Sequence, residues 1–191
     1  MNVIAINGSA RKDGNTTILI KTVLNILEKE LIDCELIYLA GEKIQGCQAC
    51  DQCKKNRNEK CIISDDIINN CIQKMKHADA IILASPTYFC NVTAEMKALI
   101  DRAGRVGRAN ENLFKNKIGA AIVSQQRAGA IHTFNSINLF FLIEQMIIPG
   151  SSYWNIGIGG EKGEVMEDTK GLSTMEVLAE QIIWLLKKLH D

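Results

Sequence analysis

The chain has 191 residues, of which 47% are hydrophobic and 23% charged, a composition typical of a globular protein with one core. Its 22 Lys and Arg balance its 22 Asp and Glu, which argues against a general nucleic-acid-binding or membrane-surface role. No apolar run is long enough for a transmembrane helix, and the first residues do not resemble a signal peptide, so we expect a cytoplasmic protein that binds neither nucleic acid nor membrane.

The predicted elements alternate between strand and helix. In chain order they are a strand at 2–7, a helix at 15–31, a strand at 35–39, a helix from 64, a strand at 80–84, a helix at 93–103, a strand at 118–123, a helix at 130–146, a fifth strand near 147–148 and a helix at 174–189. This alternation predicts an α/β fold, a flavodoxin-like doubly wound parallel sheet of order 2-1-3-4-5 in a single domain spanning 1–191. A cysteine-rich loop, residues 44–64, is inserted after strand two.

The loop after the first strand, residues 8–16, is suited to hold a phosphate. Gly8 and Gly14 permit a tight turn, and the following helix N-terminus favours an anion. The loop can add donors from Ser9, Arg11, Thr16 and Thr17. No dinucleotide or P-loop fingerprint occurs here, so one terminal phosphate fits better than a pyrophosphate. The alternative is an ordinary connection capped by Asn15 or Thr16.

Two further loops, 86–92 and 124–129, are expected at the same sheet edge as the first, because the carboxyl ends of parallel strands meet there. The second loop offers a stiff turn and an amphipathic ring at Pro86, Thr87, Tyr88 and Phe89. The third offers backbone amides and the charge of Arg127. A flat heteroaromatic with a phosphate tail, such as FMN, fits these donors. The alternatives are core packing for the two rings and a solvated surface charge for Arg127.

Four of the seven cysteines lie in the inserted loop with the spacing C-x2-C-x2-C-x7-C, at Cys47, Cys50, Cys53 and Cys61. Four thiolates suit a [4Fe–4S] cubane or a tetrahedral zinc ion, and the triplet favours the cubane. Free or redox-active thiols are the alternative. Basic residues between the third and fourth cysteines can offset a negative cluster or form a solvated loop; they are Lys54, Lys55, Arg57 and Lys60.

Together these motifs resemble the iron–sulfur flavoprotein family, within the flavodoxin-like NADPH-dependent FMN reductase superfamily. The likeness covers nearly the whole chain and is carried by residues 8–16, the four-cysteine motif, residues 85–89 and residues 97–102. It implies that the FMN phosphate is held by Ser9, Arg11, Asn15, Thr16 and Thr17. It implies that the ribityl chain and ring are bordered by Pro86, Thr87, Tyr88, Phe89 and Asn91. It implies that Cys47, Cys50, Cys53 and Cys61 hold a [4Fe–4S] cluster, and that the protein is a homodimer or homotetramer.

The function expected from the residues and the resemblance is an FMN- and [4Fe–4S]-dependent electron-transfer oxidoreductase, passing electrons between a reduced donor, such as ferredoxin, and an acceptor. Three alternatives stay open: an NAD(P)H-dependent FMN or quinone reductase without a functional cluster, a non-enzymatic redox carrier or sensor, and a zinc-stapled binding module. No catalytic side chain is expected, because the cofactors carry the chemistry. His77 and His132 are interpreted as structural or superficial.

Overall fold

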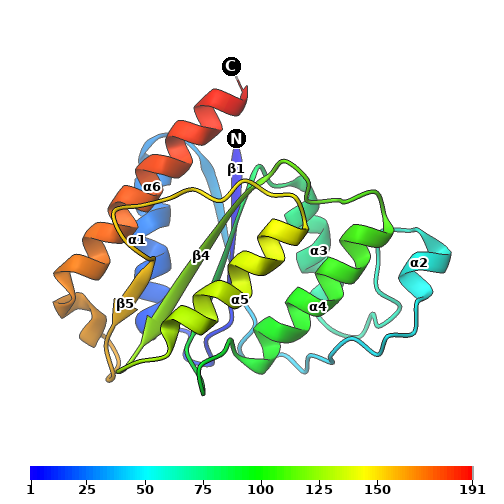
Figure 1. The fold of residues 1–191 in the computed structure, drawn as a ribbon, viewed down its shortest axis with the longest axis horizontal. Coiled ribbons are helices and arrows are strands. Elements are labelled where there is room, and N and C mark those ends of the chain that lie inside the picture. Colours follow the sequence, from blue (N-terminus) through cyan, green and yellow to red (C-terminus); the bar gives the residue numbers. More distant parts are fainter. Residues whose placement is uncertain (191) are drawn as a thin grey trace.

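A computed structural model describes residues 1–190 as a five-stranded sheet with helices on both sides (Figure 1). The strands are β1 (Asn2–Asn7), β2 (Asp33–Tyr38), β3 (Ala80–Pro86), β4 (Ile118–Gln125) and β5 (Ile156–Ile158). The helices are α1 (Asn15–Lys29), α2 (Gln52–Asn56), α3 (Ile68–His77), α4 (Ala94–Ala109), α5 (Ala130–Ile143) and α6 (Thr169–His190), with a 3-10 helix, η1 (Glu164–Glu167), before α6. All strand pairs are parallel in the order β2-β1-β3-β4-β5, which confirms the predicted flavodoxin-like topology.

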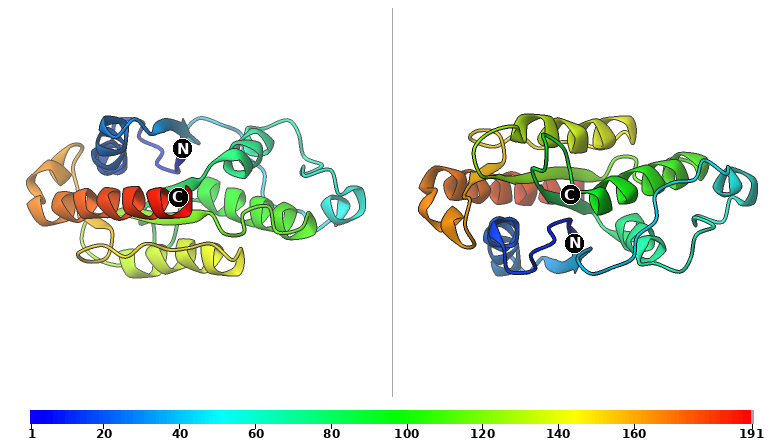
Figure 2. Two further views of the ribbon diagram at one scale, coloured as in Figure 1. Left: turned by 90° about the horizontal axis from the view of Figure 1, so that it is seen from above. Right: turned by 90° about the horizontal axis from the view of Figure 1, so that it is seen from below.

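The helices form two layers, with α1 and α6 on one face of the sheet and α3, α4 and α5 on the other, so that α1 and α5 lie on opposite sides in Figure 2. Successive side chains of β1 serve the two faces in turn: Val3 and Ala5 pack with α1, whereas Ile4 and Ile6 pack with α3 and α4. Strand β3 is buried along nearly its whole length, as expected for a central parallel strand.

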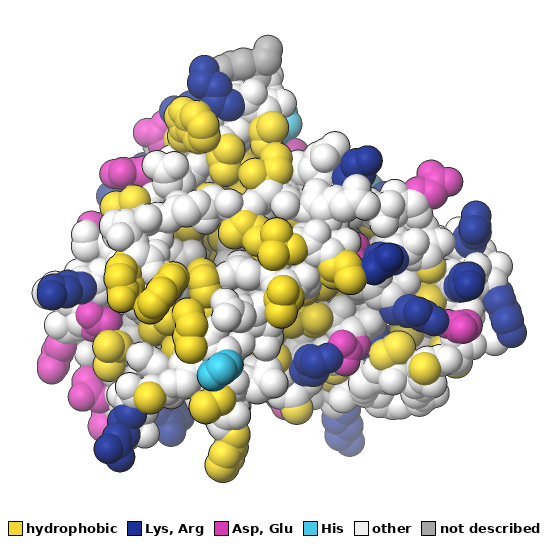
Figure 3. Space-filling model, viewed as in Figure 1, with side chains coloured by type: hydrophobic (Ala, Val, Ile, Leu, Met, Phe, Trp, Pro, Cys, Tyr) yellow, Lys and Arg dark blue, Asp and Glu magenta, His cyan; other side chains and the backbone are white. Residues whose placement is uncertain are grey.

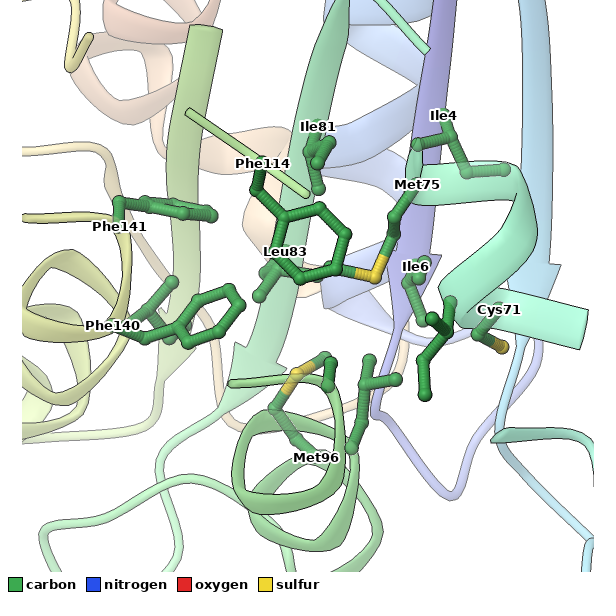
Figure 4. Close-up of a cluster of buried hydrophobic side chains, with 14 of the residues drawn as sticks. Ile4, Ile6, Cys71, Met75, Ile81, Leu83, Met96, Phe114, Phe140 and Phe141 are labelled. Carbon is green, nitrogen blue, oxygen red and sulfur yellow. The ribbon is translucent and has the colours of Figure 1, made fainter. Parts of the chain in front are cut away.

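The core beneath α4 and α5 is built around aromatic rings (Figure 4). The ring centroids of Phe114 and Phe140 are 6.2 Å apart, and those of Phe140 and Phe141 are 5.6 Å apart. Phe141 lies directly on β4 at Gly119, where a Cβ atom would come within 2.6 Å of the Phe141 Cγ. The missing side chain at Gly119 therefore lets α5 pack closely on the sheet.

The predicted fifth strand near residues 147–148 is wrong. Ile147 makes only an isolated bridge to Ile118, and the strand that joins the sheet is β5, further along the chain. Pro149 follows directly, lacks the N–H that a ladder needs, and lies where the chain leaves the sheet before it returns as β5.

The cysteine-rich loop contains the short helix α2 within otherwise irregular backbone. Helix α3 begins at Ile68 rather than at Ser64, and the Asp66 Oδ1 accepts a hydrogen bond from the Ile68 N–H at 3.1 Å. The Asp66 side chain is almost completely buried and forms an ion pair with Arg102.

Three strands end at the same edge of the sheet and bring three loops together, as predicted. Asn7 of β1 is paired with Ala84 of β3, and Pro86 at the end of β3 is paired with Ser124 of β4. None of the helices in the described part of the chain is long and apolar enough to cross a lipid bilayer.

Candidate functional site

The loop between β1 and α1 is organised by the fully buried side chain of Asn7. Its Oδ1 accepts a hydrogen bond from the Ser9 N–H at 2.8 Å, and its Nδ2 donates to the Thr17 Oγ1 at 2.9 Å. The Thr17 hydroxyl donates in turn to the Lys12 carbonyl at 2.6 Å. These hydrogen bonds fix the conformation of the loop at the start of α1, where the helix dipole favours an anion.

Two predicted phosphate contacts, Asn15 and Thr16, already have partners within the protein. Gly14 is the N-cap of α1 and no side chain caps this helix, so the alternative of a cap by Asn15 or Thr16 is wrong. The Asn15 amide instead bonds three backbone groups in residues 159–163, at 2.8 to 2.9 Å. The Thr16 hydroxyl shares a 2.8 Å hydrogen bond with the Ser124 hydroxyl at the end of β4.

The side chains of Ser9 and Arg11 have polar groups that are weakly bonded or unbonded within residues 1–190. Within the described part of the chain, the Ser9 Oγ makes only two long hydrogen bonds, at 3.2 and 3.3 Å, to the Arg11 backbone. The Arg11 side chain is exposed, and its guanidinium makes no hydrogen bond or ion pair with any other described residue. A phosphate at the start of α1 could therefore be bound by both without breaking the loop.

The loop after β3 carries a buried hydroxyl that lacks a partner. The Thr87 N–H donates to the Ser124 carbonyl at 2.8 Å, but the Thr87 Oγ1 is buried with no hydrogen-bond partner in the described part of the chain. Tyr88 and Asn91 close the loop with two backbone hydrogen bonds of 3.0 Å. Phe89, at the tip, is fully exposed with a φ of +47°. A ligand bound at this loop could supply the hydrogen bond that the buried Thr87 hydroxyl lacks.

The loop after β4 packs against the loop after β3. Gly129 has a φ of +94°, and a Cβ atom there would lie 2.7 Å from the Cys90 Sγ. Arg127 is exposed on this loop, and it lines a separate cavity with Tyr153 and Trp154. The structure thus brings the predicted phosphate and ring residues to one sheet edge, while Arg127 lies at the far side of the third loop.

The four motif cysteines, three closely spaced and the fourth further along the loop, line one small cavity beside α4. Cys47 and Cys50 are exposed, Cys53 is buried, and Cys61 is half-buried. The apolar side of the cavity is formed by Ile62, Ile63 and Val106. A cavity with thiols from four sequence positions and an apolar wall has the donor set of an iron–sulfur cluster.

Two side chains outside the motif fix the fourth cysteine. Asn69 on α3 accepts a hydrogen bond from the Cys61 N–H at 2.8 Å and donates to the Cys61 carbonyl at 2.9 Å. Arg102 on α4 donates to the Ile63 carbonyl at 2.8 Å, and, although burial opposes the rise, the nearby Cys61 thiol is among the groups that raise the pKa of Arg102. No spacing in the sequence points to Asn69, and the sequence indicates Arg102 only as part of the family motif at residues 97–102.

Positive charge surrounds the cysteine cavity. Burial raises the pKa of the Cys53 thiol, and the Lys54 backbone N–H and the Arg105 guanidinium oppose that rise. Arg105 also pairs with Asp51 at the surface. Figure 3 shows Lys and Arg side chains gathered at the α2–α4 end of the molecule. These charges can offset the negative charge of four thiolates.

The cysteines outside the motif have other surroundings. Cys71 is fully buried in the core, and burial raises the pKa of its thiol to about 12. Cys34 on β2 is half-buried, and burial with the nearby Glu28 raises the pKa of its thiol to about 11. Cys90 is exposed on the loop after β3.

The cysteine cavity and the three loops are separate places on the molecule. The cavity lies on the flank of α4 next to α2, whereas the loops lie at the carboxyl edge of the sheet (Figure 1).

Among the described residues, no group of three or more His, Cys, Asp or Glu side chains is placed to hold a single metal ion.

Solved structures of low sequence identity share this fold. The flavoenzyme FerB, an NAD(P)H:(acceptor) oxidoreductase from Paracoccus denitrificans, superposes with a TM-score of 0.68 at 17% identity, covering 95% of this chain and 96% of FerB. The Trp repressor binding protein of Bacillus subtilis gives a TM-score of 0.67 at 19% identity, with coverage of 92% and 96%. These likenesses support the fold alone.

Sequence relatives are more specific. The model of the NADPH-dependent FMN reductase family matches residues 1–161. An iron–sulfur flavoprotein of Methanocaldococcus jannaschii is 38% identical over 194 residues, which cover 98% of each chain. An iron–sulfur flavoprotein of Methanosarcina thermophila is 32% identical over 196 residues, which cover 100% of each chain. The chain therefore belongs to the NADPH-dependent FMN reductase family, among its iron–sulfur flavoproteins, and is a flavin-dependent oxidoreductase.

Proposed function

We propose that this oxidoreductase binds FMN at the three loops and a [4Fe–4S] cluster at the four cysteines, and that it passes electrons between a reduced donor, such as a ferredoxin, and an acceptor. When bound, FMN exchanges one or two electrons and the cluster exchanges one, so the pair can connect one-electron and two-electron partners. The reducing cytoplasm is the compartment in which seven unpaired cysteines and such a cluster would persist.

The observation that carries the proposal is that Cys47, Cys50, Cys53 and Cys61 line one cavity. The protein's part is to fix these thiols, to shield them with the apolar wall, and to offset their charge with Arg105 and the basic residues around α2. Two of the thiols reach the surface, which leaves a route for electrons to enter from a partner.

Of the three loops, the phosphate loop and the loop after β3 carry the side chains that we propose bind the flavin. Arg11 would pair with the phosphate, the start of α1 would add its amides, and the Thr87 hydroxyl would gain its missing partner from the ligand. Arg11→Gln should weaken FMN binding about tenfold and leave riboflavin binding unchanged, because riboflavin lacks the phosphate. Equal effects on both ligands would contradict this placement of the phosphate.

The cluster is tested by Cys50→Ser, with Cys34→Ser as the matched control because Cys34 lies on β2 outside the motif. We expect Cys50→Ser to lose iron and sulfide on anaerobic purification while it keeps FMN, and Cys34→Ser to keep both. Iron retained at the wild-type level in Cys50→Ser would remove this residue from the ligand set.

A second candidate is an NAD(P)H-dependent FMN or quinone reductase in which the cysteines have no redox role. It is favoured by the family model, which is that of NADPH-dependent FMN reductases. Steady-state NADPH oxidation that persists undiminished in Cys50→Ser would support this candidate, and its absence in the wild-type protein would argue against it.

A further inference from the structure

We propose that a second ligand site lies on the far side of the loop after β4, in the cavity lined by Arg127, Tyr153, Trp154 and Lys170, and that it binds a flat aromatic anion. The cavity has a volume of about 770 Å³, within the usual range for small-molecule sites. Four residues of the loop 124–129 belong to its lining, namely Gln125, Arg127, Ala128 and Gly129, but none of the residues predicted to hold the FMN phosphate and none of the loop after β3 does. The site therefore goes beyond the proposed function.

The walls of the cavity are suited to a flat ring. Tyr153 and Trp154 lie with their ring centroids 4.8 Å apart, and they are 69% and 51% exposed. Ile156 and Ile158 of β5 and Ile131 of α5 add an apolar floor. Figure 3 shows hydrophobic side chains gathered over β5 and the adjacent end of α5. Two aromatic rings left in water beside an apolar floor are the usual lining of a site for a planar ligand.

The charge of the cavity favours an anion. Arg127 and Lys170 are exposed, and neither side chain makes a hydrogen bond or ion pair with another described residue. The carboxylate in the lining, Asp168, accepts hydrogen bonds from the Ile158 N–H at 2.8 Å and the Gly171 N–H at 3.0 Å. The lining therefore holds two cations, Arg127 and Lys170, and one carboxylate, Asp168, so its net charge is positive and a carboxylate or phosphate on the ligand would pair with the cations.

The occupant follows from these two features together. An inorganic anion would leave the rings unused, and a neutral aromatic would leave the cations unpaired. A ring that carries a carboxylate, sulfonate or phosphate uses both, and the cavity is large enough for one to three fused rings.

The test is equilibrium dialysis of the FMN-loaded protein with naphthalene-2-carboxylate, 2-naphthylmethanol and cyclohexanecarboxylate. We expect saturable binding of naphthalene-2-carboxylate, with the neutral and the non-aromatic probes at least tenfold weaker. Flavin absorbance in the dialysate shows whether a probe merely displaces FMN, and such displacement would overturn a second site. Because no turnover is measured, the result does not depend on the cluster or on any electron donor.

Variants locate the binding. Lys170→Gln and Trp154→Leu should each weaken naphthalene-2-carboxylate binding several-fold, while the matched double variant Lys21→Gln/Lys29→Gln on α1 should not change it. Flavin content measured on Arg127→Gln separates a role in this cavity from the predicted role of Arg127 toward FMN. Absence of probe binding, equal binding of all three probes, or a dimer that Trp154→Leu dissociates would overturn the proposal, the last because a second copy would then cover the rings.

Discussion

The Arg102 guanidinium and the Asp66 carboxylate form an ion pair in which the two side chains are 0% and 1% exposed. The same guanidinium donates to the Gln45 carbonyl at 3.1 Å and to the Ile63 carbonyl at 2.8 Å. One side chain of α4 therefore holds both ends of the cysteine loop. Although burial by itself raises the pKa of Asp66, the hydrogen bonds from Arg102 and from two backbone N–H groups bring it below its usual range.

Arg102→Met should destabilise the protein by about 3–5 kcal/mol, because it leaves the buried Asp66 charge unpaired. It should also lower the iron content, because both ends of the cysteine loop lose their anchor. The measurements are urea unfolding and iron analysis. The exposed pair Lys97–Asp101 on the same helix provides the control, and Lys97→Met should cost no more than about 0.5 kcal/mol.

The double variant Arg102→Met/Asp66→Asn should recover much of the lost stability, because the buried charge is then removed. If it recovered the stability and left iron content low, the guanidinium would be needed for the cysteine loop itself. If Arg102→Met unfolded no more easily than Lys97→Met, the pair would have no structural role.

Asn15→Ala should lower the stability of the FMN-free protein by about 2–4 kcal/mol, because three hydrogen bonds to residues 159–163 are lost. Limited proteolysis should then cut within that segment. Asn25→Ala, an exposed change on the same helix, is the control. If Asn15→Ala left the stability of the FMN-free protein unchanged, these hydrogen bonds would not hold residues 159–163, and only the predicted contact of Asn15 with the phosphate would remain.

Glu144 gives the protein a pH-dependent stability. The side chain is fully buried, both carboxylate oxygens lack partners among the described residues, and burial raises the pKa of Glu144 from 4.5 to about 7 despite the nearby Arg108. Below pH 4.5 the group is protonated whether the chain is folded or unfolded, and it has no effect. As the pH rises toward 7, the unfolded chain releases the proton before the folded chain does. The free energy of unfolding therefore falls by up to about 3 kcal/mol.

Glu144→Gln should remove this loss, so that the variant is more stable than the wild type above pH 7 and the curve of stability against pH becomes flatter. Urea unfolding at pH 5 and pH 8 measures the difference. The exposed Glu176→Gln on α6 should leave the curve unchanged. A wild-type protein equally stable at both pH values would show that Glu144 is not the buried acid described.

The sequence and the structure agree where local pattern decides the outcome and differ where contacts distant in sequence decide it. The continuous apolar run of β3 and the helix start at Thr93, whose hydroxyl accepts from the Met96 N–H, could be predicted. The partners of Asn15 in residues 159–163 and of Arg102 in the cysteine loop could not, because nothing in the sequence pairs segments so far apart. The run at 147–148 has strand composition, but the chain turns away at Pro149.

The central claim is that one chain carries both FMN and a [4Fe–4S] cluster. The most direct measurement is iron, acid-labile sulfide, zinc and flavin analysis of protein purified without oxygen, together with its visible spectrum. We predict about four iron, four sulfide and one FMN per chain, with a broad cluster absorbance beside the flavin bands. Zinc in place of iron, or flavin with neither iron nor sulfide, would contradict the account.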